Sequence, residues 1–134
     1  MNVLLTDEQK INAANSEDLY IVMRDILARD NKLIQQKEHF WIVGLTNEYL
    51  IDYIELLGLG RTDQIKIGPV DVFSTAVSRK VKKVILVHSV DSDQLEPTPY
   101  DITQTKQLSA ASNILEILLL NHMIINTKDY NSFL

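Results

Sequence analysis

The sequence contains no cysteine, which excludes disulfide bonds and any zinc site built from thiolates. It has only four glycines and three prolines in 134 residues, and no low-complexity segment or internal repeat is visible. Positive charge is also scarce: the net charge is -5, which argues against general binding to nucleic-acid phosphates. These absences leave a compact, acidic domain as the expected class.

Long apolar runs are missing as well. The richest one, residues 114–125, is interrupted by Glu116, Asn121 and His122, so it is too short and too polar to cross a bilayer. Residues 1–5 do not resemble a signal peptide. Hydrophobic residues still make up 46% of the chain, enough for one ordinary core. We therefore expect a soluble, cytoplasmic protein with no membrane partner.

Two helices are predicted at the N-terminus. The segment Thr6–Gln9 has the form of a capping box, which predicts a short first helix. Asn15 or Ser16 then caps a second helix, whose apolar stripe has helical spacing: Leu19, Met23, Ile26 and Leu27. We expect residues 1–37 to form a helical lead-in packed on a domain that spans residues 38–134.

The remainder of the chain alternates between strand-like and helix-like segments. In chain order we expect strands at 40–45, 49–57, 65–67, 81–87, 116–125 and 129–133, a break at 58–60, and helices that begin at Pro69 and Pro99. The helix that begins at Pro69 should bury one face, made of Val70, Phe73, Ala76 and Val77. Strands interleaved with helices predict an α/β fold in which helices flank a mixed sheet.

Polar residues follow the expected central strand. His88 ends that strand, and because residues i and i+2 of a strand share a face, Val90 should point the same way as His88. A polar loop leads to Thr98 and Asp101 at a helix start, where both side chains are also suited to capping. On the residues alone, His88 can simply hydrogen-bond a neighbour, and Glu38 can be a surface carboxylate.

Spacing in this region matches a known family pattern. That pattern is a glutamate at the start of the first strand, then His-x-His, seven residues, a serine, two residues and an aspartate. This chain has the residues Glu38, His88, Val90, Thr98 and Asp101 at those positions, without a gap. Further similar pieces are 16–38, 68–73, 121–125 and 130–133. Over nearly its whole length the sequence resembles the RadC-type branch of the JAB/MPN (JAMM) metalloprotease superfamily.

This resemblance implies a JAB/MPN fold, a cytidine-deaminase-like sandwich, and a zinc-dependent hydrolase of peptide or isopeptide bonds. In an intact member, two histidines and the aspartate bind zinc, and a water takes the fourth position. The glutamate at the position of Glu38 accepts a proton from that water, and the hydroxyl at the position of Thr98 stabilises the oxyanion. A DNA-repair label attached to the branch says nothing about mechanism.

The departure from the pattern is Val90, which stands where the second histidine ligand is expected. Valine has no lone pair, so His88 and Asp101 remain as the two metal ligands, and loss of a ligand should weaken metal binding strongly. Asp91 or Asp93 can substitute only if they reach the site. We expect Asp91 to point to the opposite face and place Asp93 on a loop.

The leading hypothesis is therefore a RadC-like domain that has lost zinc-dependent hydrolysis, holds no cofactor, and acts by binding a protein or a nucleic acid. The alternative is an active hydrolase with a rebuilt site that binds zinc or manganese through His88, Asp101 and either Asp91 or Asp93. A homodimer is compatible with both hypotheses. A nucleic-acid contact would use the small basic cluster at residues 79–83, which otherwise forms a solvated helix end.

Overall fold

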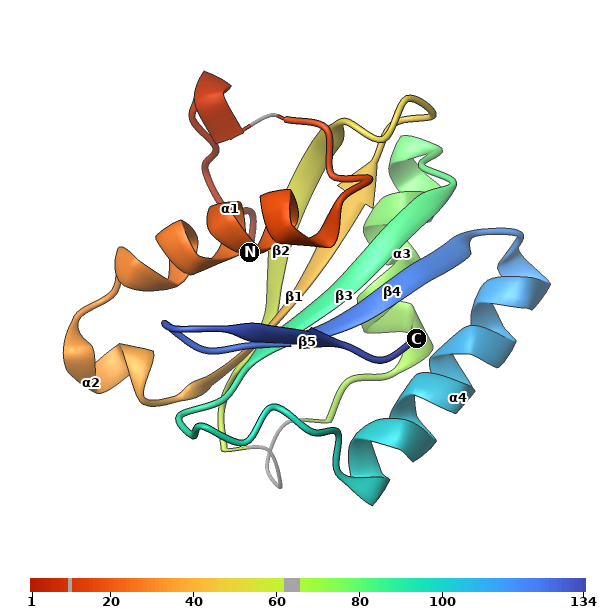
Figure 1. Ribbon diagram of the computed structural model, residues 1–134. Helices are drawn as coiled ribbons and strands as arrows, with labels where there is room; N and C mark the ends of the chain where they lie inside the picture. The colour runs from red at the N-terminus through yellow and green to blue at the C-terminus, as the bar shows by residue number, and fades with distance from the viewer. Residues whose placement is uncertain (10, 62–65) are drawn as a thin grey trace.

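The computed structural model describes residues 1–9, 11–61 and 66–134 (Figure 1). Its single sheet has the strand order β2-β1-β3-β4-β5. The strands are β1 (Glu38–Leu45), β2 (Ile51–Gly60), β3 (Lys83–Ser89), β4 (Leu118–Ile125) and β5 (Tyr130–Ser132). The α-helices are α1 (Ser16–Ala28), α2 (Lys32–Gln35), α3 (Pro69–Arg79) and α4 (Pro99–Leu115).

The strand directions make the sheet mixed. Strand β1 runs antiparallel to both β2 and β3, whereas β3 and β4 run parallel and are joined by α4. Strand β5 pairs antiparallel with β4 at one edge, as predicted for the C-terminal segment. The mixed sheet with its flanking helices confirms the predicted α/β class.

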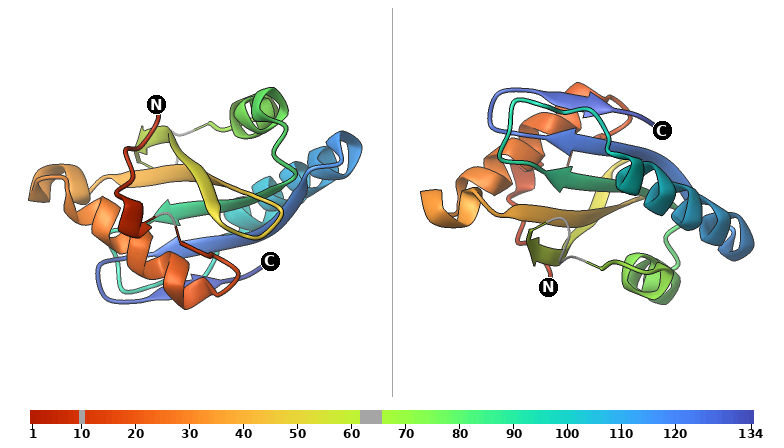
Figure 2. Two further views of the ribbon diagram at one scale, coloured as in Figure 1. Left: turned by 90° about the horizontal axis from the view of Figure 1, so that it is seen from above. Right: turned by 90° about the horizontal axis from the view of Figure 1, so that it is seen from below.

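Helices cover both faces of the sheet (Figure 2). Alternation along β3 sends Val84 and Leu86 into the core beneath α3 and α4, and sends Ile85 and Val87 into the core beneath α1. Helix α1 carries Leu19 and Met23, both fully buried, so it is a structural layer of the fold. The expected boundary between residues 37 and 38 stays a prediction. Within the described residues, no helix is long and apolar enough to span a membrane.

The predicted first helix is wrong: within the described residues of this segment, a short 3-10 turn, Asp7–Gln9, forms instead. The backbone on either side of it pairs with the outer edge of β2 instead. The amide of Val3 donates to the carbonyl of Ile54, and the amide of Ile51 donates to the carbonyl of Ile11. Extension of the sheet thus satisfies backbone groups that a helix would have satisfied internally.

The predicted break at residues 58–60 is also wrong. Strand β2 continues through Gly58–Gly60, because its backbone pairs there with β1, placing Phe40 opposite Gly58 and Glu38 opposite Gly60. Of the short strand predicted at 65–67, Ile65 lies outside the described residues, and Lys66 and Ile67 adopt no regular structure.

Helix α3 buries a different face from the one predicted. Val72, Phe73 and Ala76 are buried, whereas Val70 and Val77 are exposed. The N-caps agree better with expectation: Asn15 caps α1 and Thr98 caps α4. The remaining strands begin or end one to three residues from the predicted bounds.

A close contact between β1 and β2 explains why one position of β1 is a glycine. Gly44 lies opposite Tyr53 in the antiparallel pair, and the buried Tyr53 ring covers its Cα. A Cβ at Gly44 would lie 2.0 Å from Cε1 of that ring, far inside van der Waals contact. The ring can move away only by disturbing the core beneath α3, so this position requires glycine.

Gly44→Ala should therefore lower the free energy of unfolding by about 1–3 kcal/mol through overpacking. Urea denaturation of the variant and the parent protein measures this change. Gly68→Ala is the matched control, because its Cβ would meet only a carboxylate oxygen of Asp71 at 3.7 Å. Equal effects of the two substitutions would contradict the proposed clash.

Candidate functional site

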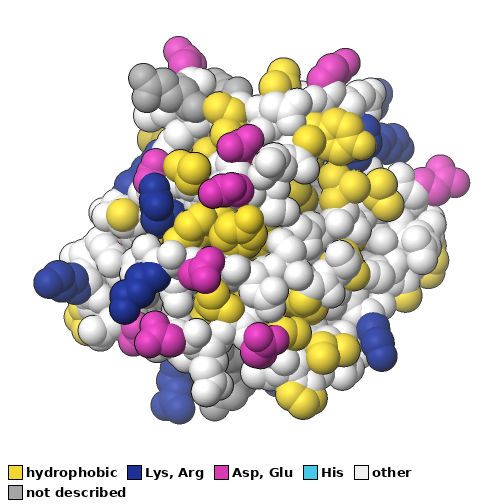
Figure 3. Space-filling view, in the orientation of Figure 1, with side chains coloured by type: hydrophobic (Ala, Val, Ile, Leu, Met, Phe, Trp, Pro, Cys, Tyr) yellow, Lys and Arg dark blue, Asp and Glu magenta, His cyan; other side chains and the backbone are white. Residues whose placement is uncertain are grey.

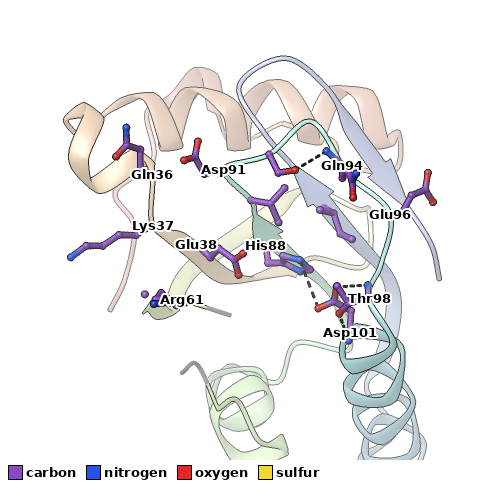
Figure 4. Close-up of a pocket in the computed structure, with 14 residues that line it drawn as sticks. Gln36, Lys37, Glu38, Arg61, His88, Asp91, Gln94, Glu96, Thr98 and Asp101 are labelled. Atoms are coloured by element: carbon purple, nitrogen blue, oxygen red, sulfur yellow. Dashed lines mark hydrogen bonds and ion pairs between the residues drawn. The ribbon is translucent and has the colours of Figure 1, made fainter. Parts of the chain in front are cut away.

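A cleft of about 580 Å³ opens at the end of the sheet where β1 begins and β3 ends (Figure 4). All five positions of the family pattern line it: Glu38, His88, Val90, Thr98 and Asp101. Ligands of α/β sheets commonly bind outside the carboxyl ends of parallel strands, where this cleft lies. The structure thus brings together the site residues predicted from the sequence.

Strand pairing explains why these residues meet. Because β1 and β3 are antiparallel, the start of β1 lies beside the end of β3, and Phe40 faces His88 in the register. Glu38 precedes Phe40 by two residues and so points to the same face of the sheet. Figure 4 shows the carboxylates of Glu38 and Asp101 on either side of the His88 ring.

The start of α4 has a capping box in which Thr98 and Asp101 bond reciprocally. The amide of Asp101 donates to Thr98 Oγ1 at 3.1 Å, and the amide of Thr98 donates to Asp101 Oδ2 at 2.8 Å. The capping interpretation of these two residues therefore describes the structure well. It uses only one oxygen of the Asp101 carboxylate.

The other oxygen, Asp101 Oδ1, is buried and has no hydrogen-bond partner within the described part of the chain. It lies 4.0 Å from Nε2 of His88, too far for a hydrogen bond. The side chains of His88 and Asp101 are 1% and 4% exposed, so both are almost completely removed from bulk water.

Behind His88, a chain of buried hydrogen bonds fixes its ring. His88 Nδ1 lies 2.8 Å from His122 Nε2, and His122 Nδ1 lies 2.6 Å from Thr105 Oγ1. The Thr105 hydroxyl lies 2.8 Å from the carbonyl oxygen of Asp101, one turn earlier in α4. These hydrogen bonds run from His88 to the backbone of Asp101, so they tie β3, β4 and α4 together.

This chain determines the tautomer of each histidine. A carbonyl cannot donate, so the Thr105 hydroxyl donates to it and must accept from His122 Nδ1–H. Neutral His122 then accepts at Nε2, so His88 donates from Nδ1. Neutral His88 is left with a bare lone pair at Nε2, which is directed toward Asp101 Oδ1.

Burial favours the neutral form of both rings. It lowers the pKa of His88 to about 4, although the nearby Asp101 carboxylate acts in the opposite direction. It lowers the pKa of His122 well below the ordinary 6.5, and repulsion from a charged His88 would lower that pKa further. Both rings are therefore neutral at pH 7.

The residues present do not fit the zinc ion that the family pattern implies. Val90 lines the cleft on the same face as His88 and supplies no donor atom. Among the residues that the structure describes, no three His, Cys, Asp or Glu side chains are grouped so that they can hold a metal ion. Catalytic zinc requires three protein ligands and an open position, whereas this site offers two.

The two substitute carboxylates lie away from His88. Asp91 lines the cleft but points toward Gln36 at its far end (Figure 4). Asp93 is 88% exposed, and its Oδ1 lies 3.9 Å from Nζ of Lys128, in a different hollow of the surface. Neither carboxylate completes a ligand set in this conformation.

The basic cluster at residues 79–83 is partly engaged in the fold. Arg79 Nε lies 3.0 Å from Asp52 Oδ2, and Lys83 Nζ donates to the carbonyl of Asn47 and lies over the Tyr49 ring. On the face shown in Figure 3, acidic, basic and apolar side chains are interspersed, and no histidine reaches the surface.

Comparison with known proteins agrees with this architecture. The model of the RadC-like JAB domain matches residues 13–134. The chain belongs to the RadC-like JAB domain family. A UPF0758 protein of Caldanaerobacter subterraneus subsp. tengcongensis is 32% identical over 92% of this chain and 51% of its own length. A UPF0758 protein of Fusobacterium nucleatum subsp. nucleatum is 27% identical over 99% of this chain and 59% of its own length.

The RadC-like domain described here spans about half the length of the curated relatives it matches. The family assignment therefore establishes the domain, and the activity of a whole relative does not transfer with it. It also confirms the resemblance recognised in the sequence from Ser16 onward. The roles of individual site residues remain predictions.

Sequence reasoning missed the part played by His122 and Thr105. The ring of His122 bonds to the side chains of His88 and Thr105, a connection that the sequence analysis did not propose. A signal exists in the sequence, since Asn121–Ile125 resembles a family segment that contains a histidine. Its pairing with His88 depends on the parallel register that sets Leu86 beside His122.

The buried histidines predict a dependence of stability on pH. Both rings are neutral in the folded protein, whereas in the unfolded chain they become protonated below about pH 6.5. The contribution of the two neutral rings to the free energy of unfolding is complete above pH 6.5. The free energy of unfolding should therefore fall as the pH drops from 6.5 toward 4. The slope is up to about 1.4 kcal/mol per pH unit for each histidine.

Urea denaturation between pH 7.5 and pH 4.5 measures this slope. The variant His88→Gln/His122→Gln removes both titrating rings and should have a much flatter profile above pH 5. If the variant and the parent protein show the same slope between pH 6.5 and pH 5, the assignment of the slope to these histidines is wrong.

Proposed function

We propose that this RadC-like JAB domain has lost zinc-dependent hydrolysis and acts by binding a protein in the cleft. The observation that supports the proposal is Val90, which lines the same cleft as His88 and Asp101 and stands where the family pattern has a histidine. With two donors, the site falls one short of the set that catalytic zinc requires. Loss of the metal would also remove the Lewis acid that lowers the pKa of a bound water molecule.

The other positions of the family pattern are assembled in one cleft, which argues for use of the cleft. Glu38 and Thr98 still line it, and the hydrogen bonds behind His88 hold the ring in one tautomer. Buried polar networks of this kind are costly unless every member is satisfied. A binding role explains why such a network persists beside a missing ligand.

Charge favours a protein partner over nucleic acid. Among the described residues, the acidic side chains that line the cleft are Glu38, Asp91, Glu96 and Asp101, and the basic ones are Lys37 and Arg61. A phosphate backbone would be repelled by this balance. The proposal includes a cytoplasmic location, and it allows the protein partner to be a second copy of this chain.

Metal analysis of the purified protein tests the loss of zinc. The parent protein should contain no stoichiometric zinc after purification, and Val90→His should bind zinc at least about 10- to 100-fold more tightly, because it supplies the third ligand on the existing face. Calorimetric titration with zinc measures both affinities. The variant Val90→His/Asp101→Asn is the control: asparagine keeps an oxygen for the cap but removes the anionic ligand.

Stoichiometric zinc or manganese in the parent protein, lost on Asp91→Asn, would contradict the proposal and support a hydrolase with a rebuilt site. If Val90→His binds zinc no better than the parent protein, the geometry of a former metal site is also absent.

A further inference from the structure

We propose that the floor of the cleft binds a primary alkylammonium group, such as the lysine side chain of a partner protein, between His88 Nε2 and Asp101 Oδ1. This inference rests on the proposed function, because a zinc ion held at the same two atoms would exclude the ligand. It identifies the chemistry of the group that the cleft receives.

Two hydrogen-bond acceptors face each other across a gap at this floor. The tautomer deduced above leaves His88 Nε2 as a bare lone pair, and Asp101 Oδ1 is a carboxylate oxygen with no hydrogen-bond partner within the described residues. They are 4.0 Å apart.

A single donor group can span the gap. With hydrogen bonds of about 2.8–3.0 Å, one nitrogen that donates two hydrogens bridges acceptors separated by 4.0 Å. An alkylammonium has three N–H donors and a positive charge. It would therefore supply the hydrogen bond and the opposite charge that a buried carboxylate requires. The second oxygen of Asp101 is already committed to the helix cap, so Oδ1 alone is available to the ligand.

The walls of the cleft suit the stem of a lysine. Val90 and Ile124 line it with aliphatic side chains, and a lysine buries its methylene groups along such surfaces while its charged end reaches a polar site. The acidic excess around the cleft attracts a cation. In this proposal, the Val90 side chain contacts the methylene groups of the lysine, whereas an imidazole at position 90 would fill the space that they occupy.

Titration with Nα-acetyl-lysine N-methylamide, followed by NMR, tests the proposal on the whole chain. The expected result is saturable binding, with movement of the His88 Nε2 resonance as it accepts a hydrogen bond. The norleucine analogue keeps the four side-chain carbons of lysine but lacks the terminal ammonium group, and it should bind at least about tenfold more weakly. n-Butylammonium distinguishes the source: weaker binding than the lysine amide supports a protein partner, and equal binding supports a free amine.

Asp101→Asn should weaken lysine-amide binding at least about tenfold, because it removes the charge and keeps an acceptor for the cap. Asp93→Asn is the matched control, since Asp93 loses the same charge outside this cleft and should leave the affinity unchanged. Equal binding of the lysine and norleucine amides, no binding of either, or insensitivity to Asp101→Asn would overturn the ammonium site.

Failure of the ammonium site can be distinguished from failure of the proposed function. If lysine amide fails to bind while Val90→His still acquires zinc, the loss of hydrolysis stands and only the ligand assignment falls. If the parent protein proves to hold zinc at His88, both conclusions fall together, and metal analysis reveals this before any titration.

Discussion

The hydrogen bond between His88 and His122 is the interaction on which the site depends. It joins neighbouring parallel strands through side chains rather than through the backbone, and it sets which nitrogen of His88 faces the cleft. Thr105 anchors the far ring, and its own hydroxyl returns to the backbone of Asp101. These hydrogen bonds together fix the orientation of His88 and connect it to the helix that carries Asp101. Contacts of this kind commonly orient the histidine ligands of metal sites, and here they orient the ring of His88.

The two carboxylate oxygens of Asp101 have different surroundings. Oδ2 completes the capping box of α4, so the residue is useful to stability whether or not the cleft binds anything. Oδ1 remains buried beside His88 without a hydrogen-bond partner in the described chain, at a cost that capping does not explain. The carboxylate therefore cannot be assigned to structure alone. The sequence left two interpretations of this residue open, helix capping and a role as a ligand in the site. The first concerns Oδ2 and the second concerns Oδ1.

Much of the fold could be predicted from the sequence, because its signals are local. Asn15 and Thr98 mark helix starts by their own side chains, and the apolar run before His88 indicates a central strand. The predictions failed where distant pairing decides the outcome. Gly58–Gly60 stays in a strand because β1 lies beside it, and the segment near Ile11 pairs with β2 instead of forming a helix. For the site, spacing placed Glu38, His88 and Asp101 in one cleft, but the partnership of His88 with His122 required the strand register.

The pairing of the N-terminal segment with β2 has a consequence for the solubility of the sheet. An uncovered edge strand presents a row of amides and carbonyls that can recruit a strand from another molecule and start aggregation. Here contacts such as those of Val3 with Ile54 and of Ile11 with Ile51 occupy part of that row. The N-terminal segment, which was predicted to be helical, thus covers part of the edge of β2. Self-association through that part of the edge is blocked while the segment stays paired with β2.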